Sequence, residues 1–131
     1  MIKEAYCSFE VSKLLKEKGF DVYGDGSFGS NTEIHREYLP NGKTINTLYG
    51  AKPHKDAYPA PTHQMAMAWL REICDLIIYV KLVDDGDPCH DAWGFVIYNK
   101  FTNEYIKSDK LWFKYEEATE AALKYSLKNL I

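Results

Sequence analysis

Hydrophobic residues recur at the spacing of a helix in three segments of the chain. The first segment, residues 8–18, begins at Ser8, a favoured N-cap, and is followed by Gly19, which favours a helix end. The second segment, residues 62–75, has Thr62 as its expected N-cap. Its predicted core stripe consists of Met65, Ala66, Trp69, Leu70 and Ile73.

The third predicted helix, residues 115–130, carries Glu116, Glu117 and Glu120 near its start, where the helix dipole favours negative charge. Lys114 precedes it and is a poor N-cap, because its side chain offers no hydrogen-bond acceptor.

Five other segments predict β-strands. Residues 34–39 and 44–49 flank a short connection that contains Asn-Gly, a strong signal for a β-hairpin. Residues 76–83 are apolar on both faces of an expected strand, which predicts a central strand. Residues 92–99 read as its antiparallel neighbour, and residues 104–107 as a short third strand.

The order of these elements predicts an α+β fold, an antiparallel sheet of about three to five strands with three helices packed mainly on one face. Residues 50–61 contain three prolines and predict an extended crossing segment. The chain has 131 residues, of which 46% are hydrophobic. This length and composition predict a single domain, residues 1–131, with one core.

Cysteine usage and the absence of long apolar runs bear on the compartment. Cys7, Cys74 and Cys89 are odd in number and show no paired spacing, which argues against a secreted disulfide framework. No run of about 18 apolar residues and no signal-peptide pattern is present. We therefore expect a cytoplasmic protein that does not use a membrane as a partner.

Residues 24–29 match the glycine pattern of phosphate-binding loops. A dinucleotide site requires a strand before the loop and a helix after it, whereas this segment follows a helix and precedes a hairpin. We interpret it as an irregular connector.

The acidic segment, residues 84–91, offers carboxylates beside Cys89 and His90, so a divalent cation is one hypothesis. Its spacing matches no calcium loop, and a solvated hairpin connection is the simpler interpretation. The four histidines lie in different predicted elements. We assign no metal ligand and no cofactor.

Nucleophilic catalysis would need an activated cysteine or serine. Cys7 or Cys74 could be combined with a histidine and an aspartate, but no nucleophile motif selects such a set. We assign no catalytic residue, and the sequence favours a protein without catalytic activity while leaving an enzyme open.

The order helix, three strands and helix in residues 62–130 resembles the outline of a double-stranded-RNA-binding domain. The strands and last helix also resemble the arm-binding domain of phage integrases. Basic and aromatic residues alternate in this part of the chain, as nucleic-acid binding would require. The candidate binding surface consists of Lys100, Tyr105, Lys107, Lys110, Trp112 and Lys114. Sheet-edge lysines beside buried aromatic residues are the competing interpretation.

Residues 6–20, 59–72 and 115–123, the second of which opens with PAPTHQM, look familiar together. They resemble a set of small proteins of gut Bacteroides and of their phages and mobile elements. The resemblance implies a bacterial or phage cytoplasm and brings no activity with it.

Three functional hypotheses follow. The first is an accessory or protein-interaction protein without catalysis, whose tyrosines and tryptophans bind a protein, either another chain or a second copy. The second is a nucleic-acid-binding module that uses the C-terminal sheet, although the net charge of −3 gives it no overall electrostatic support. The third is small-molecule or metal binding at residues 84–91.

Overall fold

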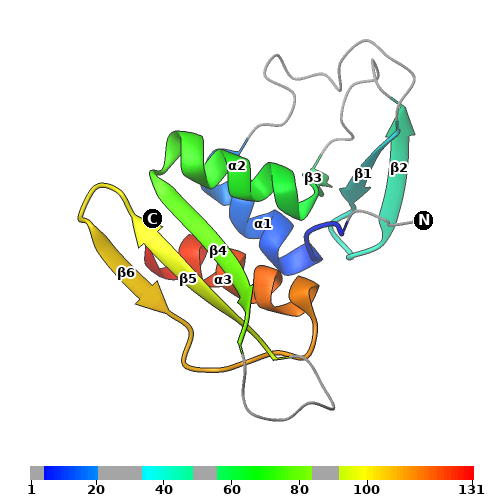
Figure 1. The fold of residues 1–131 in the computed structure, drawn as a ribbon. Helices are drawn as coiled ribbons and strands as arrows, with labels where there is room; N and C mark the ends of the chain where they lie inside the picture. Colours follow the sequence, from blue (N-terminus) through cyan, green and yellow to red (C-terminus); the bar gives the residue numbers. More distant parts are fainter. Residues whose placement is uncertain (1–4, 21–33, 49–55, 84–91) are drawn as a thin grey trace. The chain divides into compact units, whose positions relative to one another are not determined.

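The structure is a computed structural model that describes residues 5–20, 34–48, 56–83 and 92–131 (Figure 1). These residues form three helices and two antiparallel sheets of three strands each, which confirms the predicted α+β class. The chain divides into two compact units, residues 1–62 and 63–131, which are described in turn. The elements are α1 (Phe9–Glu17), β1 (Ile34–Tyr38), β2 (Thr44–Leu48), β3 (Tyr58–Pro59), α2 (His63–Ile73), β4 (Leu76–Leu82), β5 (Trp93–Asn99), β6 (Glu104–Lys107) and α3 (Tyr115–Asn129).

Helix α1 of the first unit has both of the predicted ends. The Ser8 side chain accepts a hydrogen bond from the backbone N–H of Val11, at 3.1 Å, which satisfies one of the unpaired amides of the first turn. Gly19 follows the helix with a φ of +92°, a conformation that glycine adopts without steric cost.

The predicted hairpin is also confirmed. Strands β1 and β2 pair in antiparallel register with Tyr38 opposite Thr44, and Gly42 in the turn has a φ of +87°. Strand β3 pairs with the other side of β1, so the sheet order is β2-β1-β3. The expected extended segment before α2 is therefore a short strand in the part that the structure describes.

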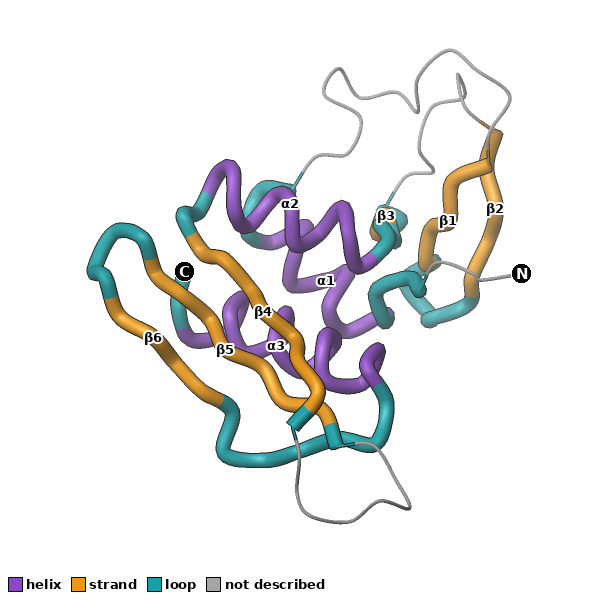
Figure 2. The backbone as a smooth tube through the Cα atoms, viewed as in Figure 1, coloured by secondary structure: helices purple, strands orange, loops and turns teal. Residues whose placement is uncertain are grey.

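The second unit is a three-stranded antiparallel sheet in the order β4-β5-β6 with two helices (Figure 2). The prediction that residues 76–83 form a central strand was wrong, because β4 lies at the edge and β5 in the middle. Side chains of β4 are largely half-buried or exposed, whereas Phe95, Val96 and Ile97 of β5 are buried. The apolar residues on both faces of β4 are thus only partly buried, as the edge position of the strand allows.

Helix α3 covers one face of this sheet. The rings of Phe95 and Tyr125 lie 6.2 Å apart, and those of Trp93 and Tyr115 lie 5.3 Å apart. Helix α2 contacts both β4 and α3. The buried residues of α3 are Ala118, Thr119, Ala122, Leu123, Ser126 and Leu127.

The apolar stripe predicted for α2 was only partly right. Ala66 and Leu70 are fully buried and His63 is buried, whereas Met65 is 41% and Ile73 is 68% exposed. Met65 lies about 100° around the helix axis from Ala66, and Ile73 is the last helical residue. As predicted, Lys114 makes no side-chain cap to α3.

Candidate binding surface

The sheet of the second unit has a face opposite the one that α3 covers. Paired residues of neighbouring strands point to the same face, and successive residues alternate. The register therefore places one set of side chains on the face away from α3, which we call the open face. It consists of Ile77, Tyr79, Lys81, Gly94, Val96, Tyr98, Tyr105 and Lys107.

Tyrosine and lysine dominate the open face. Tyr79 is 51% and Tyr105 is 67% exposed, and the rings of Tyr98 and Tyr105 stack at 4.7 Å. The Tyr98 hydroxyl donates to Asn103 Oδ1 at 2.6 Å, which holds its ring in place. Lys81 and Lys107 are exposed, and none of the eight residues is acidic. The open face thus combines aromatic surface with positive charge.

The six residues predicted as a binding surface do not form one surface. Tyr105 and Lys107 lie on the open face. Trp112 lies on the other face, where its ring stacks on Phe95 at 5.7 Å, and the Lys110 ammonium lies 5.7 Å from the Trp112 ring centre.

The remaining two residues lie at other places in this unit. The N–H of Lys100 donates to the carbonyl of Asp75, which places it in the turn after β5. Lys114 directly precedes α3. The structure therefore brings together Tyr105 with Lys107, and Lys110 with Trp112.

Sequence reasoning missed Tyr79, Lys81 and Tyr98 as members of the open face. A signal was present, because the alternation within residues 76–83 and 92–99 separates these side chains from the core-facing ones. The strong apolar character of residues 76–83 obscured this alternation.

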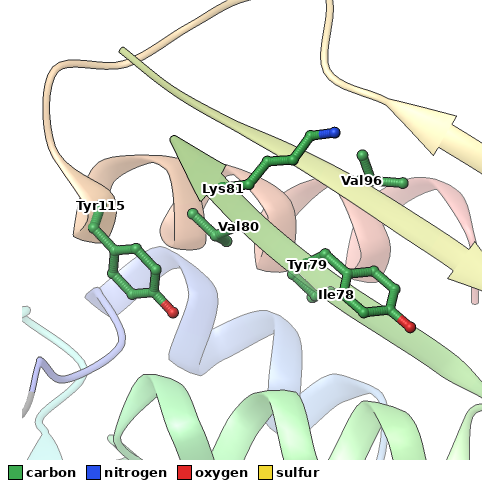
Figure 3. A pocket seen from close by; sticks show the side chains of 6 residues that line it. All are labelled: Ile78, Tyr79, Val80, Lys81, Val96 and Tyr115. Carbon is green, nitrogen blue, oxygen red and sulfur yellow. The ribbon is translucent and has the colours of Figure 1, made fainter. Parts of the chain in front are cut away.

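A groove with a volume of about 550 Å³ runs along β4 (Figure 3). Ile78 and Val80 belong to the face that α3 covers, and Tyr79 and Lys81 to the open face. The groove thus includes both sides of the edge strand. Its lining residues are Ile78, Tyr79, Val80, Lys81, Val96 and Tyr115.

A histidine–carboxylate pair joins the two helices of the second unit. His63 Nε2 lies 2.6 Å from Glu120 Oε2, and the buried Nδ1 of His63 has no hydrogen-bond partner among the residues that the structure describes. The pair connects the first turn of α2 with α3, and no local motif could have revealed it. Its low exposure favours a structural role.

The described cysteines are poorly suited to act as nucleophiles. Cys7 is fully buried. Burial raises the pKa of the Cys74 thiol above its ordinary value, and the negative charge of Asp75 raises it further. A raised pKa disfavours the thiolate, which is the reactive form.

The residues that the structure describes hold neither a metal-binding group nor a membrane-spanning helix. No three His, Cys, Asp or Glu side chains there are grouped so that they could hold a metal ion. Nor does any helix in those residues have the length and apolar character needed to cross a bilayer. The glycine-rich residues 24–29 and the acidic residues 84–91, with Cys89 and His90, lie outside the described part, so those hypotheses stay predictions.

No protein-family model, curated protein or solved structure matches this chain. The helix, three strands and helix expected in the second unit are confirmed as an order of elements. The resemblance to proteins of gut Bacteroides and their phages stays a prediction.

Proposed function

We propose that this protein is a protein-interaction module that binds its partner through the open face of the β4-β5-β6 sheet. One observation carries the proposal, namely the three tyrosines that share this face, two of them more than half exposed. Tyrosine offers a large, rigid apolar surface with a polar end, and it is enriched among the residues that dominate binding energies at protein interfaces.

Charge on the open face supports a partner with an acidic surface. Lys81 and Lys107 are the charged residues of this face, and both are positive. Complementary charges accelerate encounter and disfavour partners of the wrong sign. We therefore expect a partner that presents carboxylates beside apolar groups.

Single-stranded nucleic acid is the second candidate ligand. The open face favours it because the face carries aromatic rings and none of its eight residues is acidic. Bases stack on tyrosine rings, and lysines bind phosphates. Two lysines give few phosphate contacts, however, and the exposed Glu116 and Glu117 place negative charge at the start of α3. A protein partner therefore remains the preferred proposal.

Affinity capture from a lysate of the source organism tests the proposal, with and without nuclease. The bait is the intact chain, either unchanged or with Tyr79→Ser and Tyr105→Ser. The matched control is Phe113→Ser, which removes a 69% exposed aromatic ring that is not one of the eight residues of the open face. We expect the tyrosine variant to lose about ten-fold or more of the partner, since interface anchors each contribute more than about 1 kcal/mol.

The outcomes separate the candidates. A protein that survives nuclease and is retained by Phe113→Ser but lost by the tyrosine variant supports the proposal. Recovery that disappears with nuclease, together with salt-sensitive binding of labelled oligonucleotides, supports the nucleic-acid candidate instead. Equal recovery with all three baits would refute a role of the open face.

A further inference from the structure

We propose that the outer edge of β4 accepts an extended segment of the partner as an additional strand, in which apolar and acidic side chains alternate. This inference rests on the proposed function and specifies the kind of protein segment that the module recognises. It draws on the backbone of β4, the groove beside it and the charge of Lys81.

Backbone hydrogen bonds show which groups of β4 point outward. Val83 donates to the carbonyl of Ala92 at one end of the strand, and Lys100 donates to that of Asp75 at the other. Hydrogen-bonded pairs alternate with non-bonded pairs in an antiparallel ladder, so the odd-numbered residues of β4 bond to β5. The N–H and C=O groups of Ile78 and Val80 therefore point away from β5.

No strand among the described residues pairs with this edge. Natural edge strands are commonly guarded by brevity, proline, bulges or several charges. Strand β4 has seven residues without proline, and Lys81 is its one charged residue. Extended peptides bind other proteins by adding to edges of this kind.

The groove determines which side chains an added strand would carry. Ile78 and Val80 line it together with Tyr115 on the face that α3 covers, so guest residues on that side should be apolar. Lys81 lines it on the open face, where a guest carboxylate would be the complementary group. Directly opposed side chains in neighbouring strands are about 5 Å apart, within the range of an ion pair.

Fluorescence anisotropy with a labelled heptapeptide tests the inference. The probe alternates valine with glutamate, and the control peptide replaces every glutamate by lysine. We expect the intact protein to bind the glutamate peptide more tightly than the lysine peptide. Lys81→Glu should reverse this preference, with a change of about five-fold for each peptide.

A substitution at Val80 tests the backbone contact. Val80→Pro removes an N–H that β5 does not use, a position at which an edge strand tolerates proline. The matched control Val80→Thr keeps the N–H and the branched side chain. We expect the proline variant to bind the glutamate peptide about ten-fold more weakly and the threonine variant to bind within about two-fold of the original.

Hydrogen exchange gives a readout that needs no substitution. The outward amides of Ile78 and Val80 should exchange faster than those of Tyr79 and Lys81 in the free protein, and the glutamate peptide should slow them. Absence of binding at millimolar peptide, equal binding by both Val80 variants when both fold, or unchanged exchange at Ile78 and Val80 would each overturn the inference.

Failure of this inference is distinct from failure of the proposed function. Loss of partner capture by the tyrosine variant without peptide binding at β4 would leave the open face as the interface and remove the added strand. Peptide binding at β4, together with partner capture that the tyrosine variant does not reduce, would support the added strand and refute the open face as the interface.

Discussion

Cys74 shows how the surroundings of one side chain set its chemistry. It follows α2 and precedes Asp75, whose φ of +57° turns the chain toward β4. Burial is the larger cause of the raised thiol pKa, and the Asp75 carboxylate adds to it by opposing a second negative charge. At neutral pH the thiol therefore stays protonated.

Asp75→Asn should make Cys74 more reactive. The substitution removes the opposing charge and lowers the thiol pKa, and asparagine tolerates a positive φ. We expect alkylation of Cys74 by iodoacetamide near pH 8 to accelerate about two- to three-fold, and the rate to keep rising to a higher pH in the unchanged protein than in the variant. Peptide mapping by mass spectrometry measures the rate at this residue. Identical pH profiles would show that Asp75 has no part in the shift.

The elements of the first unit depend on two glycines with positive φ. Gly42 lies in the hairpin turn, and a Cβ atom there would approach the Phe9 ring to 3.3 Å. Gly19 ends α1, and a Cβ atom there would meet nothing within 4 Å. Both positions thus require a positive φ, but only Gly42 lies where a side chain would contact a neighbouring ring.

Gly19→Ala should lower the free energy of unfolding by about 1 kcal/mol, since alanine is disfavoured at positive φ. Gly42→Ala should cost more, because the same penalty is combined with the contact to Phe9. Urea unfolding of both variants measures the difference. A loss for Gly42→Ala no greater than that for Gly19→Ala would show that the Phe9 ring moves aside freely.

Local signals in the sequence predicted most of the elements. The Ser8 cap, the Asn-Gly turn and the helical periodicity of residues 115–130 each act within a few residues of the chain, and all three predictions are confirmed. The position of β4 depends instead on which strands pair with it. Its apolar residues suit a central strand and an edge strand beside helices equally well.

The candidate site was also predictable only in part. Tyr105 and Lys107 were predicted from the alternation of basic and aromatic residues along the chain, and the register places both on the open face. Trp112 was assigned to the same surface, but it pairs with Trp93 and so faces the side that α3 covers. The register shifts by two residues between β6 and this pair, which leaves the alternation of faces unchanged, so Trp112 at an even-numbered position lies opposite to Tyr105 and Lys107. The predicted strand ended at residue 107, so this alternation was not applied to Trp112.

At the scale of the whole molecule, the two units could unfold together or separately. The sequence predicts one domain, and a unit of about 60 residues buries only about 60% of its unfolded surface and is marginal alone. We therefore expect the chain to unfold in a single transition. All three tryptophans lie in residues 63–131, and the fully buried Cys7 lies in residues 1–62.

These residues report on the units separately. In a variant with Cys74→Ser and Cys89→Ser, thiol labelling of Cys7 follows the first unit and tryptophan fluorescence follows the second as urea increases. Coincident midpoints are expected for one cooperative domain. Labelling of Cys7 at a lower urea concentration than the fluorescence change would show two domains.

The buried face of α3 is made largely of small side chains, including Ala118 and Ala122. These residues let the helix backbone approach its neighbours closely, so the space beneath them cannot take an added methylene group without displacing the helix. Natural variation should therefore be uneven along this helix, with alanine or glycine retained at both positions while exposed positions such as Glu116 and Lys128 drift. A record of accepted substitutions would then reveal the orientation of α3 without a structure.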